Sequence, residues 1–167
     1  LQASANFLYF TTNIFTTTTD SFFAALVVRI PLSQLDSASS ITFDYLSVVG
    51  SYGSIAPVNG ASAEGTRAGR TTMYFGSVDS STSIKVLTWP ESSTSLTIST
   101  VSGLATTVSA TFVCPGPGGL DPCTRASRRM QTGWITNTEL GFMWNAAQNG
   151  SARPYPYIRS VILNPST

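Results

Sequence analysis

Short runs of alternating hydrophobic and polar residues cover most of the chain and end at Gly, Pro or Ser/Thr clusters. Runs of this kind predict β-strands. We expect strands over residues 6–15, 22–30, 41–49, 70–78, 84–89, 95–101, 106–114 and 157–163, with further strand character over 134–144. Residues 22–30 are nearly all apolar, so that periodicity does not separate a buried strand from a helix, and the β-branched residues favour a strand.

Residues 157–163 are predicted to form one short strand, which two prolines precede. One face takes Tyr157, Arg159, Val161 and Leu163, and the other takes Ile158, Ser160 and Ile162. Pro165 removes the next donor and ends the strand. Because a single strand is not stable by itself, we expect it to pair with strands far upstream.

Only two stretches favour a short helix, namely 33–40 and the basic stretch 125–131. Residues 50–69 predict a long irregular segment rich in Gly, Ser and Ala. The pattern therefore predicts an all-β fold: a single antiparallel jelly roll or β-sandwich of about eight to ten strands, with one or two very short helices. The length of 167 residues is typical of one domain, so we expect residues 1–167 to form a single domain.

The composition narrows the function classes. Only 10% of residues are charged, Ser and Thr together number 47, and the formal net charge is +1. A charge this small gives no field that would by itself predict a nucleic-acid partner. No apolar run approaches the roughly 18 residues of a membrane helix, so we expect no membrane partner.

The chain contains no histidine, which excludes Ser-His-Asp and Cys-His catalytic sites. A pair of carboxylates, as in glycoside hydrolases, is the remaining enzymatic option, with Asp44 and Glu139 as the candidates within predicted strands. Five other acids lie in turn-like contexts, where carboxylates are ordinarily solvated or cap a turn: Asp20, Asp36, Asp79, Glu91 and Asp121. We therefore expect no enzyme activity, no catalytic residue, no metal site and no cofactor.

Three arginines form the basic cluster of the chain: Arg125, Arg128 and Arg129. On a helix, their spacing would place them on one face, where they could contact phosphates or a partner without reading bases. An ordinary solvated helix face is the favoured interpretation, and nucleic-acid or partner contact is the alternative.

Cys114 and Cys123 flank a Gly/Pro-rich loop. If oxidised, they would close a short loop, worth about 2–3 kcal/mol, and would indicate an extracellular setting. Two unpaired thiols beside a turn are the other interpretation, and the sequence does not choose between them.

Aromatic residues are a further candidate site, because exposed rings can stack on sugars. The candidates are Trp89, Trp134, Trp144, Tyr52, Tyr155 and Tyr157. Most Trp residues in a domain of this size are core or interface anchors, which is the alternative for each of them.

Two stretches resemble the single jelly-roll coat protein of small icosahedral RNA viruses. Gly69-Arg-Thr-Thr-Met-Tyr-Phe-Gly-Ser-Val-Asp79 is similar to a strand of that family, and Tyr157-Ile-Arg-Ser-Val-Ile-Leu-Asn-Pro165 is similar to its last strand, especially in sobemovirus-like coats. The order of the predicted elements resembles the family over most of the chain. The basic arm and the paired calcium-binding aspartates known from that family have no counterpart here.

The resemblance implies a structural coat subunit that self-assembles into an icosahedral shell around nucleic acid, located in the virion. Its partners would be further copies of itself and genomic RNA, the RNA mainly through a terminal arm not present in this sequence. Few charges suit such a subunit, because contacts between copies would otherwise bury unpaired ions. The alternative is a secreted β-sandwich that binds glycans or acts as an adhesin, and a carboxylate-pair hydrolase is a third hypothesis.

Overall fold

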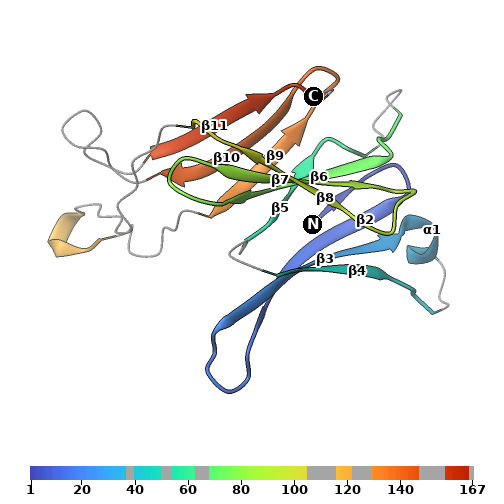
Figure 1. Cartoon of the computed structure of the whole chain (residues 1–167), viewed down its shortest axis with the longest axis horizontal. Helices are drawn as coiled ribbons and strands as arrows, with labels where there is room; N and C mark the ends of the chain where they lie inside the picture. The colour runs from blue at the N-terminus through green and yellow to red at the C-terminus, as the bar shows by residue number, and fades with distance from the viewer. Residues whose placement is uncertain are drawn as a thin grey trace.

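The computed structural model describes residues 1–36, 40–49, 54–62, 68–104, 116–121, 129–146 and 157–165. Within these ranges the chain is mostly β, which confirms the all-β prediction. The described residues form eleven strands, one short α-helix and one 3-10 turn. The strands form two sheets that lie in separate layers (Figure 1).

The first sheet has four antiparallel strands in sequence order, β1-β2-β3-β4. Its strands are β1 (Gln2–Ala3), β2 (Phe7–Phe15), β3 (Phe22–Pro31) and β4 (Asp44–Val49). Aromatic and β-branched residues dominate β2 and β3, as expected for a pleated surface. The helix α1 (Leu32–Leu35) follows β3 and is a single turn.

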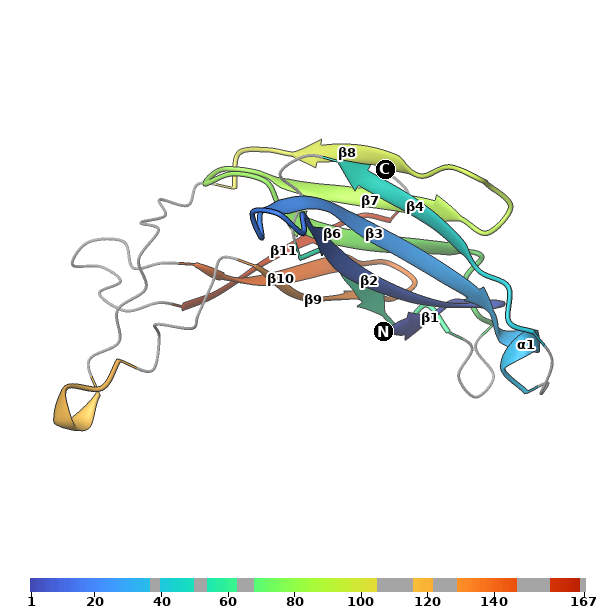
Figure 2. The same ribbon diagram turned by 90° about the horizontal axis from the view of Figure 1, so that it is seen from below.

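The second sheet has seven strands in the order β11-β10-β9-β5-β6-β7-β8. Its strands are β5 (Ala56–Asn59), β6 (Thr72–Val78), β7 (Ile84–Pro90), β8 (Thr97–Val101), β9 (Met130–Ile135), β10 (Leu140–Ala146) and β11 (Tyr157–Leu163). This sheet curls into a half-barrel. Figure 2 shows β2, β3 and β4 as one layer and the curled sheet as the other.

Two details of the predicted architecture are wrong. The second sheet is mixed, since β5 and β9 pair in parallel, with Val58 opposite Gly133. In addition, the two sheets differ in size and the larger one is curled, so the fold is not a clean jelly roll. The cause is β5, a four-residue strand inside the segment expected to be irregular, which inserts between β6 and β9 and joins two hairpin groups into one sheet.

Three local predictions also change. The helix expected over 125–131 is wrong at its C-terminal end, because Met130 and Gln131 belong to β9 and Met130 is buried opposite Trp144. Residues 125–128 lie outside the described residues. The stretch 134–144 contains two strands, since a turn closed by the Thr136 N–H and the Glu139 carbonyl interrupts it. The strand expected over 106–114 also falls outside the described residues.

The final strand is found as predicted, at Tyr157–Leu163, with burial that alternates along it. Its partner differs from the prediction. In the described part of the chain, β11 pairs with β10, the preceding strand, and forms one edge of the sheet.

The core has two parts. Between the sheets, Tyr9 meets Phe75 and Trp89 at ring-centre distances of 5.8 Å each. Inside the curl of the second sheet, the Phe142 ring lies so close to Gly76 that a Cβ at residue 76 would come within 2.4 Å of it. Glycine is therefore needed at position 76 for the sheet to curl this tightly.

Candidate functional site

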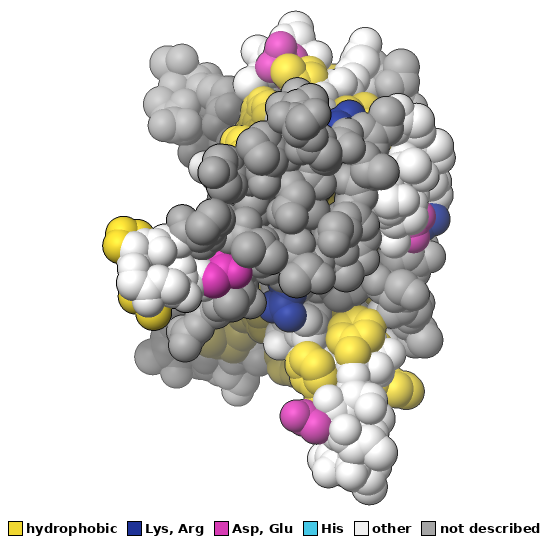
Figure 3. All heavy atoms as spheres, turned by 90° about the vertical axis from the view of Figure 1, so that its left-hand side faces the viewer, with side chains coloured by type: hydrophobic (Ala, Val, Ile, Leu, Met, Phe, Trp, Pro, Cys, Tyr) yellow, Lys and Arg dark blue, Asp and Glu magenta, His cyan; other side chains and the backbone are white. Residues whose placement is uncertain are grey.

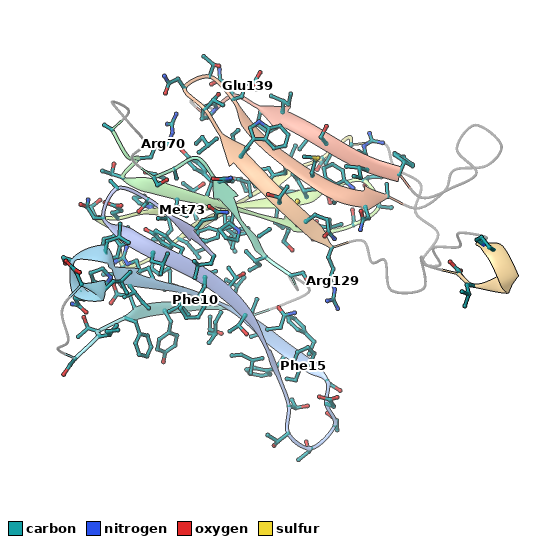
Figure 4. All side chains as sticks on the ribbon, turned by 180° about the vertical axis from the view of Figure 1, so that it is seen from behind. Phe10, Phe15, Arg70, Met73, Arg129 and Glu139 are labelled. Atoms are coloured by element: carbon teal, nitrogen blue, oxygen red, sulfur yellow. The ribbon has the colours of Figure 1, made fainter. Side chains whose placement is uncertain are left out.

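Of the three predicted arginines, the structure describes only Arg129. It is exposed, directly precedes β9, and lies at the opposite end of the β9–β10 hairpin from Glu139 (Figure 4). Arg125 and Arg128 lie outside the described residues. The expectation that the three arginines share one face therefore stays a prediction.

The cysteine prediction also lies outside the structure. Neither Cys114 nor Cys123 falls within the described residues. The disulfide and the free-thiol interpretations both stay predictions.

The two candidate catalytic carboxylates belong to different sheets. Asp44 begins β4 in the first sheet, where its carboxylate pairs with Arg29. Glu139 lies in the turn before β10 in the second sheet. Among the described residues no group of three or more Cys, Asp or Glu could hold a metal ion. Asp44 and Glu139 therefore do not form the predicted carboxylate pair within one sheet.

The predicted aromatic platform is mostly inside the protein. Trp89 and Trp144 are 1% and 3% exposed, and both belong to the core. Trp134 is half-buried, and its ring covers Gly141. Tyr157 is also half-buried, whereas Tyr52 and Tyr155 lie outside the described residues. For the two core tryptophans the core-anchor alternative is confirmed.

The most organised polar group in the described structure surrounds Arg29, which the sequence shows only as an interruption of an apolar strand. Arg29 is 6% exposed, and its Nε and Nη2 each lie 2.9 Å from Oδ2 of Asp44. Its Nη1 donates to the Glu91 carbonyl at 3.0 Å. Its guanidinium stacks between the rings of Phe7 and Trp89, at 4.7 and 4.5 Å from their centres. Such stacking and hydrogen bonding make a buried arginine tolerable.

The Glu91 carboxylate extends this polar group to the N-terminal segment. It accepts hydrogen bonds from the Ser4 hydroxyl, from the Asn6 N–H at 3.0 Å and from Asn6 Nδ2 at 2.8 Å. Together with Arg29 it ties the start of the first sheet to the end of β7 in the second. We therefore assign this group a structural role.

Tyr9 lies beside this group and is fully buried. Its hydroxyl has no hydrogen-bond partner among the described residues. Burial raises the pKa of Tyr9 above its ordinary value near 10, although the neighbouring Ser4 and Arg29 act in the opposite direction. A cavity of about 260 Å³ opens near Arg29 and Trp89, with Phe43, Asp44 and Tyr45 on its rim.

A second feature is the side of the first sheet that faces away from the core, which we call the outer face. Tyr9 on β2 and Arg29 on β3 point toward the second sheet, because they contact Trp89. Side chains alternate along a strand, so that the neighbours Phe10 and Val28 point outward. These two are cross-strand partners, and Tyr45 on β4 continues the row.

Most outward positions of the first sheet are apolar, and the exposed Thr12 and Ser47 are polar exceptions. Phe43 and Tyr45 are its exposed large apolar members, Val28 is buried, and five more are half-buried: Leu8, Phe10, Ile14, Leu26 and Ile30. Phe43 and Tyr45 are 59% and 60% exposed, and their ring centres lie 6.3 Å apart. No outward position on β2, β3 or the described side chains of β4 is charged. Figure 2 shows no described helix or strand across this sheet.

Exposed aromatic rings continue at the hairpin that joins β2 to β3. This hairpin projects from the body, and Phe15 and Phe23 beside its turn are 48% and 56% exposed. Figure 3 shows hydrophobic side chains gathered at this lower end of the molecule. Exposed aromatic side chains gathered in this way make the outer face and the hairpin a candidate interaction site.

Sequence reasoning missed the outer face because β2 and β3 carry apolar residues on both sides. The pattern of apolar and polar residues along β2 and β3 therefore does not identify the side that the second sheet covers. A signal was present in the lack of any charged residue among residues 7–15 and 22–28, since a solvated sheet face normally carries polar side chains.

Comparisons with protein-family profiles, with curated proteins and with solved structures found no match. No helix among the described residues is long and apolar enough to cross a membrane.

Proposed function

We propose that this chain is a structural coat-protein subunit that self-assembles into an icosahedral shell around nucleic acid, without catalytic activity. The observation that carries the proposal is the apolar outer face of the first sheet. A surface with Phe43 and Tyr45 about 60% exposed and no charged neighbour on the same face is stabilised when another subunit covers it.

The fold in this proposal is a modified jelly roll. Two packed β-sheets support it, while the parallel pairing of β5 with β9 departs from it. In the modified form, the second sheet has gained strands and curled. Contact with genomic RNA would involve the predicted cluster of Arg125, Arg128 and Arg129, of which the described Arg129 is exposed.

Self-association tests the proposal directly. Phe43→Lys and Tyr45→Lys each place a charge on an exposed position of the outer face, so the fold should persist. Thr138→Lys adds the same charge at an exposed turn of the second sheet and is the matched control. We expect the wild type and the control to form large assemblies in light scattering and closed shells in electron microscopy, and the two outer-face variants to associate at least tenfold more weakly.

One result would overturn the proposal. A wild-type chain that stays a 17.7 kDa monomer at every concentration, by sedimentation, is incompatible with a coat subunit. RNA can also be added during assembly. Shells that contain no RNA under that condition would remove only the packaging part of the proposal.

The alternative, a secreted glycan-binding domain, gains no support from Trp89 and Trp144, which are buried. A thiol titration of the unfolded chain separates the two hypotheses further. Two free thiols at Cys114 and Cys123 favour the coat subunit, and an intact bridge favours secretion.

A further inference from the structure

Among the described residues, strand β8 is the last strand at one side of the second sheet. In the described part of the chain it pairs with β7 alone, in regular register from Ile84 opposite Val101 to Thr88 opposite Thr97. Natural proteins protect such edges with charged residues, prolines or bulges. Residues 97–101 contain none of these, and the first four are exposed. The nearest charge is Lys85 on β7, whose Nζ donates to Thr100 Oγ1 at 2.7 Å.

Two cavities flank β8, one at each of its faces. The first, about 270 Å³, lies between β8 and β4 and is lined by Leu46, Val48, Leu96 and Ile98 together with two serines. The second, about 280 Å³, lies between β8 and the end of β11, the two edges of the curled sheet. Its walls include Ser99 and Val101 of β8. Neither lining contains a charged side chain.

This arrangement fits an added β-strand. Its backbone would pair with the N–H and C=O groups of β8 that face away from β7, and its side chains would point alternately toward the two cavities. A charged side chain directed into either cavity would lose water without gaining a partner. The site therefore selects an extended, uncharged strand with aliphatic and hydroxyl side chains.

The edge strands differ in how well each could serve as the strand added beside β8. In the described part they are β1, β4, β8 and β11. Strand β1 has two residues, β4 carries Asp44 and β11 carries Arg159, so that β8 is the one of adequate length without a charge. We infer that β8 of one subunit pairs antiparallel with β8 of a second copy of this chain. The two curled sheets then become continuous across a two-fold axis, as in isologous dimers.

The inference rests on the proposed function, because it assumes that the chain associates with itself, but it involves a different surface from the outer face. Ser99→Lys places a charge at the centre of the β8 edge, where the residue is exposed and the fold should tolerate it. We expect the dimer dissociation constant, measured by sedimentation velocity, to rise at least tenfold. Thr138→Lys is again the control and should leave it unchanged.

Hydrogen exchange of the unmodified chain provides a measurement that needs no variant. Amides of residues 97–101 that face away from β7 should exchange at least tenfold more slowly in the dimer than in the dilute monomer. One set of results would overturn the β8 pairing and leave the coat-subunit proposal standing. In that set, the chain associates without protection of these amides, Ser99→Lys still forms dimers, and Tyr45→Lys associates more weakly. A chain that never associates would overturn both.

Discussion

The guanidinium carbon of Arg29 lies 4.5 Å from the centre of the Trp89 ring, and this contact joins the two sheets. Arg29 belongs to β3 and Trp89 to β7, so the cation–π contact spans the interface between the layers. The charge of Arg29 is balanced by Asp44, whose side chain is 62% exposed. The buried partners of Arg29 are thus the aromatic rings and backbone carbonyls, and its ionic partner faces solvent.

Removing Arg29 should therefore cost more stability than removing its acid. We expect Arg29→Ala to lower the free energy of unfolding by about 2–4 kcal/mol, because it leaves two rings and the Glu91 carbonyl without their partner. Asp44→Ala should cost about 1 kcal/mol or less, since the pair is screened by water on the acid's side. Urea denaturation measures both values, and equal losses for the two variants would contradict this assignment.

The sequence indicates the strands better than their pairing. The bounds of β11 agree with the prediction because prolines flank a run of seven residues, Pro156 before it and Pro165 shortly after it. β5 was missed, since four residues that include Pro57 show no period. Its parallel pairing with β9 depends on contacts between segments that are distant in sequence, and no local pattern encodes them.

The candidate site was less predictable for a related reason. An arginine within a buried strand implies a partner, but only the register that places Arg29 opposite Asp44 identifies it. Likewise, the exposure of Phe43 and Tyr45 follows from which side of β4 faces the second sheet. Both facts depend on tertiary packing, which local alternation does not determine.

Tyr9 should make stability sensitive to alkaline pH. Its pKa is raised in the folded state, mainly by burial, so that the unfolded chain releases the proton at lower pH than the folded one. The stability due to the neutral phenol is complete below pH 10 and is lost as the pH rises above that value. Tyr9→Phe should flatten the fall in melting temperature above about pH 10, and an unchanged profile in this variant would contradict the assignment.

The same variant tests the cost of the unpaired hydroxyl. Because Tyr9 Oη has no partner among the described residues, Tyr9→Phe should be neutral or stabilise the chain by about 1 kcal/mol at pH 7. A loss of more than about 1 kcal/mol would mean that the hydroxyl makes a hydrogen bond in solution.

Gly76 should be intolerant of any side chain. A Cβ there would lie 2.4 Å from Cδ1 of Phe142, and Phe142 is fully buried, so its ring has little room to move. We expect Gly76→Ala to lower the free energy of unfolding by about 1–3 kcal/mol through overpacking. The double variant Gly76→Ala with Phe142→Leu should regain part of that loss, and no recovery would place the strain elsewhere.

Gly141 provides a contrast, because its crowding partner can move. A Cβ at residue 141 would lie 2.1 Å from the Trp134 ring, but Trp134 is only half-buried and can rotate toward solvent. Gly141→Ala should therefore cost less than Gly76→Ala, and should shift part of the tryptophan fluorescence to longer wavelength. Trp89 and Trp144 stay buried in the core and provide the unshifted background. A large loss of stability with unchanged emission would show that the Trp134 ring is held in place and that the strand itself must move.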